Sequence, residues 1–184
     1  DGLRPQAPKI DRVSPASPTT ESTVVIYGSA AAGLAYELTG GLADRIAGTV
    51  PADGRLAISV PLNLNRSNHL ELTVRSSSGL VSDPAVAEVT HDSVAPTVAS
   101  TVPADGAVGI ARNLPLSVVF SEVIRQVDLA GITVTAGSAS IQGTKTLAAD
   151  GCTLTFTPAA LLPEATAISL IVPAALRDLA GNAM

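Results

Sequence analysis

The chain has 184 residues, of which 46% are hydrophobic, 15% charged and 2% aromatic, and its formal net charge is −5. A chain this apolar is not expected to be a disordered tail, and its negative charge argues against nucleic-acid binding. Four aromatic residues and no Trp leave few rings for stacking on sugars or bases. No run approaches the roughly 18 apolar residues that a membrane-spanning helix needs.

Short runs of alternating apolar and polar residues predict β-strands, and no segment has the period of an amphipathic helix. In chain order the clearest runs lie at 56–60, 70–74, 116–120, 152–156 and 168–172. Two more strands are expected at 84–90 and 97–102. Such short runs, bounded by Gly, Pro, Asn or Asp, are typical of a β-sandwich.

Turn and linker signals divide the chain into two halves. The dipeptides Asp53-Gly54, Asp105-Gly106 and Asp150-Gly151 predict tight turns with positive φ at glycine. The segment 91–96 ends in Pro96, which biases the residue before it toward an extended backbone. We therefore predict an all-β chain with one β-sandwich over 1–93, a short linker, and a second β-sandwich over 94–184.

The second half carries several spaced motifs, namely 95–97 (APT), 101–107 (TVPADGA), 118–122 (VVFSE), 154–158 (LTFTP) with Leu161, and 176–182 (LRDLAGN). In this order they resemble the bacterial Ig-like domain family first recognised in S-layer proteins. The first half looks like another such module at 25–28 (VIYG), 52–54 (ADG) and 68–74 (NHLELTV). The resemblance implies two tandem Ig-like β-sandwiches.

The family's DLAGN turn is followed by a final strand, whereas this sequence ends two residues after Asn182. The second sandwich is therefore expected to lack its last strand here and to be the less stable half. Two interpretations stay open. The strand lies in later residues, or it comes from another chain by strand donation, which would make that chain a partner and could build a polymer.

No catalytic set is expected. Nucleophilic catalysis needs a nucleophile, a base and an orienting group. His69 is expected to be exposed on a strand, and His91 to be solvated or at an interface in the linker. Cys152 alternates with Leu154 and Phe156, which predicts a core position as a small hydrophobe. We therefore expect a protein that is not an enzyme.

Calcium is the one cofactor that the acidic residues could serve, because it takes six to eight oxygen ligands. Asp83, Glu88 and Asp92 lie near the linker, and Asp178 and Asn182 share one loop. Neither set follows the twelve-residue EF-hand pattern. The alternative for Asp178 and Asn182 is a turn whose side chains bond their own backbone.

The family resemblance implies non-catalytic structural or spacer modules of a larger bacterial cell-surface, adhesin or S-layer-like protein, located outside the cell. Their partners would be neighbouring domains of the same polypeptide. The alternatives are a ligand-binding or accessory module of a secreted enzyme, and a polymerising subunit completed by strand donation. Phe120, Phe156, Tyr27 and Tyr36 all fall in strand-like runs. We expect these rings in the two cores, with none left for a stacking surface.

Overall fold

Alternation of buried and exposed side chains shapes the strands, and β5 (Arg55–Pro61) shows it most clearly. Leu56, Ile58 and Val60 are buried, and the residues between them are exposed. This period of two places one face of the strand against a core and the other in water. The computed structural model describes residues 3–41 and 44–184, in which all but one of the regular elements are strands.

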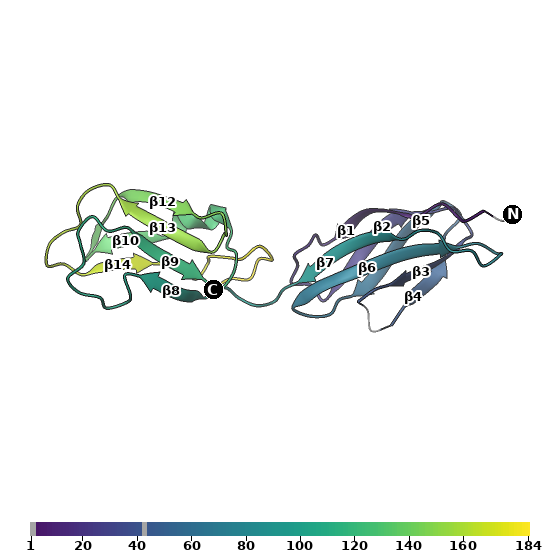
Figure 1. Cartoon of the computed structure of the whole chain (residues 1–184), viewed down its shortest axis with the longest axis horizontal. Helices are drawn as coiled ribbons and strands as arrows, with labels where there is room; N and C mark the ends of the chain where they lie inside the picture. Colours follow the sequence, from purple (N-terminus) through teal and green to yellow (C-terminus); the bar gives the residue numbers. More distant parts are fainter. Residues whose placement is uncertain (1–2, 42–43) are drawn as a thin grey trace. The chain divides into compact units, whose positions relative to one another are not determined.

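The chain divides into two compact units, residues 1–93 and 94–184. In the first unit two antiparallel sheets face each other (Figure 1). One sheet has the order β1 (Lys9–Ser14), β2 (Thr23–Ser29), β5. The other has the order β4 (Ile46–Thr49), β3 (Ala35–Thr39), β6 (Arg66–Arg75), β7 (Ala85–His91). The core between them is aliphatic, with Leu38, Leu70 and Leu72 all at 0% exposure.

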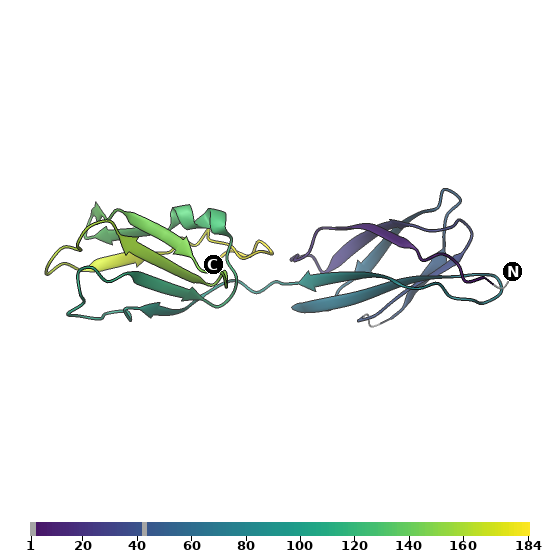
Figure 2. The same cartoon turned by 45° about the horizontal axis from the view of Figure 1, so that its top comes forward.

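The second unit is also a sandwich of two antiparallel sheets. The larger sheet has the order β12 (Gly143–Leu147), β13 (Thr153–Pro158), β9 (Leu116–Phe120), β8 (Val98–Val102). The smaller has the order β11 (Ala139–Ser140), β10 (Thr133–Ala136), β14 (Ile168–Ile171). A short 3₁₀ helix, η1 (Gln126–Gly131), precedes β10 and is drawn as a coil in Figure 2. Two sandwiches built from strands confirm the predicted all-β class.

The predicted turns form as expected. Gly54, Gly106 and Gly151 have φ values of +72°, +72° and +69°, a region that favours glycine. The turn at Gly151 closes the hairpin between β12 and β13. The turn at Gly54 instead connects β4 to β5, which lie in different sheets of the first unit.

A buried amide ties one corner of the first unit together. Asn68 is 1% exposed, and its Oδ1 accepts a hydrogen bond from the backbone N–H of Asn63 at 2.7 Å. Its Nδ2 lies 3.1 Å from each of the carbonyl oxygens of Asn63, Arg66 and Val89. Burial of an amide is tolerated because these backbone partners replace water.

The expectation for the aromatic rings is right at three positions and wrong at Tyr27. Phe120 and Phe156 are each 2% exposed in the second core, and Tyr36 packs against the first core. On β2, however, Val24 and Ile26 face the core, so Tyr27 points to the opposite side of the sheet. There the guanidinium of Arg12 lies 3.7 Å from the centre of its ring. That contact is a cation–π interaction on the outer face.

Candidate functional site

The acidic loop near the end of the second unit is organised around one buried carboxylate. Asp178 is 1% exposed, and its Oδ1 accepts hydrogen bonds from the backbone N–H groups of Gly181, at 2.6 Å, and Asn182, at 2.9 Å. Its Oδ2 accepts a third from Asn182 Nδ2 at 2.7 Å. The structure thus brings Asp178 and Asn182 together in the turn that was the alternative to a calcium loop.

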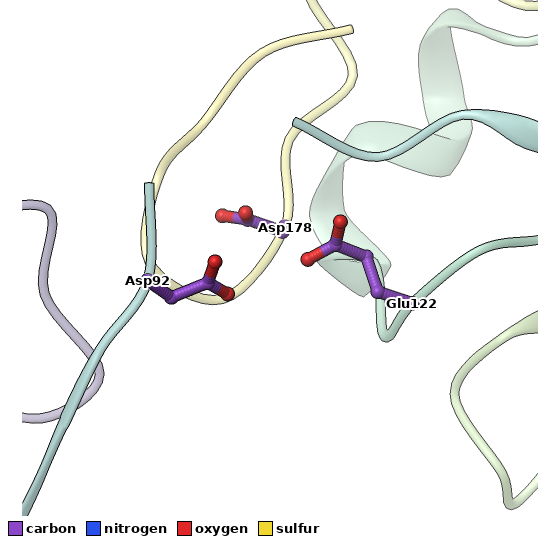
Figure 3. A group of neighbouring side chains, drawn as sticks. All are labelled: Asp92, Glu122 and Asp178. Atoms are coloured by element: carbon purple, nitrogen blue, oxygen red, sulfur yellow. The ribbon is translucent and has the colours of Figure 1, made fainter. Parts of the chain in front are cut away.

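A second carboxylate approaches this loop. Glu122 follows β9 and is half-buried, and one of its oxygens lies within 4.8 Å of an Asp178 oxygen. Figure 3 shows both side chains. Glu122 was not among the predicted ligands, because 56 positions of sequence separate it from Asp178. An ionised carboxylate offers about four acceptor positions, of which Asp178 uses three, so the pair could still provide oxygen ligands to a cation.

Asp92, which Figure 3 also draws, belongs to the first unit. It is half-buried, and its backbone N–H donates to the carbonyl oxygen of Thr19 at 2.9 Å. This bond extends the pairing of His91 with Thr19 by one residue beyond the end of β7. Asp92 therefore follows the strand that leads out of the first sandwich.

The three calcium candidates of the first unit do not gather at one place. Asp83 precedes β7 and pairs with Arg4, whose Nη1 lies 2.9 Å from Asp83 Oδ1. Glu88 lies in the middle of β7, and Asp92 lies after its end. At about 3.3 Å per residue, Asp83 and Asp92 are near opposite ends of an extended strand. Calcium binding at these residues stays a prediction.

Glu88 belongs instead to a polar cluster on the exposed face of the sheet that contains β6 and β7. His69 lies directly opposite Glu88, and its Nδ1 contacts the Glu88 carboxylate. Its Nε2 lies 3.2 Å from Glu71 Oε1, and Ser67 Oγ donates to Glu88 Oε2 at 3.0 Å. The hydrogen bonds to Glu88 and then to Glu71 raise the pKa of His69. The bond from His69, followed by that from Ser67, lowers the pKa of Glu88.

His69 is exposed, as predicted, but the expectation for His91 is wrong. His91 is 3% exposed at the end of β7, where it pairs with Arg66 of β6. Its Nδ1 accepts a hydrogen bond from the backbone N–H of Asn65 at 2.9 Å. The last strand of the first sandwich continues one residue beyond its predicted end at Thr90, and that residue, His91, is enclosed by its neighbours. His91 is therefore a structural acceptor within the first unit.

Cys152 does not occupy the core position that its alternation predicted. It lies in a bend just before β13 and is half-buried, whereas Leu154 and Phe156 are buried as expected. The bend forms because Asp150 Oδ1 accepts hydrogen bonds from the backbone N–H groups of Cys152, at 2.8 Å, and Thr153, at 3.0 Å.

The hollows of the first unit are shallow. One of about 130 Å³ lies beside Tyr36, Arg45 and Arg75 on the sheet that contains β3 and β6. A broad open depression of about 780 Å³ crosses the outer face of the other sheet, where Arg12 covers the ring of Tyr27. Ligand pockets usually enclose about 300–1,000 Å³; the first hollow is smaller than that, and the second is open to solvent.

Residues 92–184 match the family model described as the bacterial Ig-like domain, which covers just over half of the chain. Among the described residues no helix is long and apolar enough to cross a bilayer. A search of the curated proteins finds no match.

Two solved structures are similar to this chain at low identity. One is of a 1.5-MDa bacterial ice-binding adhesin studied for its retention at a host cell surface, with 14% identity and a TM-score of 0.39 over 84% of this chain. The chain spans 54% of the length of that structure. The other is a chimeric titin Z1Z2 with an exogenous KLER peptide from decorin, with 12% identity and a TM-score of 0.31 over 91% of this chain and 96% of that one. The match of the family model shows the family: the chain belongs to the bacterial Ig-like domain family.

Proposed function

We propose that the two units are non-catalytic structural modules that space other parts of a larger bacterial cell-surface or adhesin-like protein. One observation carries the proposal: the buried polar side chains that could take part in chemistry form hydrogen bonds that stabilise the fold. Asp178 closes its own turn, His91 accepts from Asn65, and Asn68 bonds three backbone segments. Groups held in this way are poorly placed to act on a substrate.

The family supports the same proposal, since fold alone does not set function and the site has to be argued separately. Membership of the bacterial Ig-like domain family favours a location outside the cell. The polar groups of the exposed sheet face, His69, Glu71 and Glu88, pair with one another. A surface whose polar groups already bond to one another suits a spacer better than a binding module.

The ligand-binding alternative has less support. The open depression on the first unit has a Tyr ring in it, but Arg12 covers that ring at 3.7 Å. Stacking on a sugar would require displacing the guanidinium. The strand-donation alternative rests on β14, which among the described residues pairs on one side only, with β10.

A replacement experiment tests the spacer proposal. In the bacterium that makes the protein, residues 1–184 of the full-length polypeptide would be exchanged for two unrelated β-sandwich domains of equal total length. A deletion of the same residues serves as the control. A spacer predicts that the exchanged protein reaches the surface and works as the natural one does, whereas the deletion is impaired. Loss of function on exchange would show that the surface of these units is itself recognised.

A further inference from the structure

Three cations lie on the outer face of the sheet formed by β1, β2 and β5 in the first unit (Figure 1). In one cross-strand row, Ser29 of β2 lies between Lys9 of β1 and Arg55 of β5. In the next row, Arg12 of β1 lies opposite Tyr27 of β2. Buried residues alternate with these positions along β2 and β5, so the two rows share the face that is turned away from the core.

This face is hollowed where the two rows meet. The open depression of about 780 Å³ is lined by residues of both rows, among them Arg12, Tyr27, Ser29 and Arg55. Ala57 lies opposite Tyr27 on β5, and its methyl group leaves the space beside the ring unfilled. The hollow has the volume of a ligand pocket but is not enclosed. That shape suits a chain that crosses the surface better than a small molecule.

Tyr27 positions Arg12 without using its hydrogen-bond donors. The guanidinium carbon lies 3.7 Å from the centre of the ring, so the ring contacts the flat side of the group. The five N–H donors of a guanidinium lie in its plane and stay available in such a contact. A planar group held in this way is preorganised to form two parallel hydrogen bonds to a carboxylate.

The two arginines of this face have donors to spare. Within residues 3–41 and 44–184, the guanidinium groups of Arg12 and Arg55 form neither an ion pair nor a hydrogen bond. Arg4, Arg45 and Arg112, by contrast, each pair with a carboxylate. The charge that would complement Arg12 and Arg55 is therefore a negative group from outside the described chain.

Two carboxylates line the same depression, and both have partners. Asp11 pairs with Lys9, whose Nζ lies 2.6 Å from Asp11 Oδ1. Asp53 Oδ1 accepts a hydrogen bond from the backbone N–H of Arg55 at 3.1 Å. These acids leave the arginine donors free but keep the summed charge of the face low. A ligand with widely spaced negative groups fits this face better than a densely charged polymer such as nucleic acid.

The face can be recognised only through side chains. The backbone of β2 pairs with β1 on one side and with β5 on the other. An extended peptide binds a sheet by pairing with an edge strand, and the middle of this face offers no such edge. A polysaccharide instead presents hydroxyl groups along its length, and the hydroxyls of Ser29 and Tyr27 can both donate to and accept from them.

We propose that the outer face of β1, β2 and β5 binds a polysaccharide that carries carboxylate groups at intervals along its chain. Arg12 binds one carboxylate and Arg55 binds another. Since β1 and β5 lie about 10 Å apart across β2, the two arginines reach different sugars. Contact with the guanidinium takes the place of stacking on the Tyr27 ring, which Arg12 covers. This binding goes beyond the spacing role and does not depend on it.

The test is an NMR titration of the 184-residue chain with a hyaluronan hexasaccharide, which has a carboxylate on every second sugar. The backbone signals of Tyr27 and the Nε signals of Arg12 and Arg55 should shift. Those of Arg66, exposed on β6 in the other sheet, should not. The methyl ester of the same hexasaccharide keeps the sugars but lacks the charges, and should bind about fivefold more weakly or less. Added salt should weaken binding of the acid form.

Substitutions locate the contacts. Arg12→Gln and Arg55→Gln should each weaken binding about fivefold, whereas the matched control Arg66→Gln should leave it unchanged. Arg12→Lys should recover only part of the affinity, because lysine keeps the charge but lacks the planar fork. Melting temperatures equal to that of the wild type would show that the variants keep the fold. The comparison of acid and ester on the wild-type chain needs no variant.

The proposal fails if the acid hexasaccharide shifts no signal on this face, or if the ester binds as tightly. It also fails if Arg66→Gln weakens binding as much as Arg12→Gln does. Tighter binding of a hexapeptide of alternating glutamate and serine would assign the face to an acidic peptide. Tighter binding of a chondroitin sulfate hexasaccharide would make it a general surface for polyanions. Either result overturns the proposal.

Discussion

At the scale of single residues, buried polar groups explain more of this structure than any exposed reactive group does. Asp178 is 1% exposed and holds three donors of its own turn. Asn68 and His91 are equally enclosed and bond to backbone atoms of other segments. Because a buried donor or acceptor without a partner costs free energy, each of these side chains stabilises a specific loop geometry.

Replacement of Asp178 by alanine should destabilise the second unit. The substitution leaves the N–H groups of Gly181 and Asn182 without their acceptor, which should lower the free energy of unfolding by about 3 kcal/mol. Thermal unfolding of Asp178→Ala and of the exposed control Asp105→Ala checks this. We expect Asp178→Ala to lower the melting temperature equally in chelator and in calcium, because the three hydrogen bonds need no ion.

The same measurement tests whether Glu122 joins Asp178 and Asn182 in a calcium site. If Glu122 and Asp178 hold calcium, adding the ion to chelator-treated wild-type protein raises the melting temperature, and Glu122→Gln removes that rise. An unchanged melting temperature would leave these carboxylates with a structural role alone.

The His69 cluster should make the stability of the first unit depend on pH. The pKa of His69 is raised by its bonds to Glu88 and Glu71, so its contribution is complete below the ordinary pKa of about 6.5 and is lost as pH rises through the raised value. The pKa of Glu88 is lowered by His69, so its contribution is present above the ordinary value of 4.5 and is lost as pH falls. The cluster therefore stabilises most between about pH 5 and 6.5.

Comparing wild type with His69→Asn checks the window. The difference in melting temperature between the two proteins should be largest near pH 5.5 and shrink toward pH 9. A difference that stays constant across this range would show that the ring acts through packing instead of through its charge.

At the scale of elements, a lysine holds the short helix η1 in place. Lys145 extends from β12, and its ammonium group donates to the carbonyl oxygens of Leu129, at 2.9 Å, Ala130, at 3.3 Å, and Ile132. Carbonyls at the end of a helix lack intrahelical partners. The cation satisfies them and ties the helix to the opposite sheet.

Lys145→Met should lower the free energy of unfolding of the second unit by about 2 kcal/mol, because it keeps the apolar stem but removes the charged donor. Lys9→Met is the matched control, since Lys9 pairs with Asp11 on the surface of the first unit. Urea unfolding of the two variants measures both effects. Equal losses would mean that the carbonyl contacts add no stability.

Strands whose alternating pattern lies within a few residues could be predicted from the sequence, whereas elements that form only through partners distant in the sequence could not. The runs that became β5, β6, β9, β13 and β14 alternate within a few residues, so local pattern alone identified them. β4, which reads Ile-Ala-Gly-Thr, and β12, which begins with glycine, lack that alternation and form because longer neighbours pair with them. The helix η1 depends on Lys145, a partner from a later strand.

The candidate site was harder to predict for the same reason. The turn of Asp178 and Asn182 is local and was anticipated, whereas the approach of Glu122 crosses 56 positions. The burial of His91 depends on Asn65 and Thr19, which no nearby residue indicates. Local periodicity identifies strands, but it does not show which loops meet.

At the scale of the whole molecule, the two units differ in the size of their cores. Among residues 3–41 and 44–184, the first unit buries twelve hydrophobic side chains and the second buries ten, seven of which form its main cluster. Since buried apolar area is the main stabilising term, the first unit should be the more stable.

Calorimetry of the full chain should therefore show two transitions, with the second unit unfolding first. Leu154→Ala, at a position with 0% exposure, should shift only the lower transition, at a cost of about 3 kcal/mol. Leu38→Ala, also at 0% exposure, should shift only the upper one. If Leu154→Ala moves the upper transition instead, the order of stability is reversed.

The most direct test of the structural role is to stretch one molecule between its ends. A spacer built from two independently folded sandwiches should resist tension and then extend in two separate steps of about 30 nm each, since an unfolded residue spans about 3.5 Å. The smaller core of the second unit predicts that its step comes at the lower force. Extension without resistance, or a single step that releases both units together, would contradict the account.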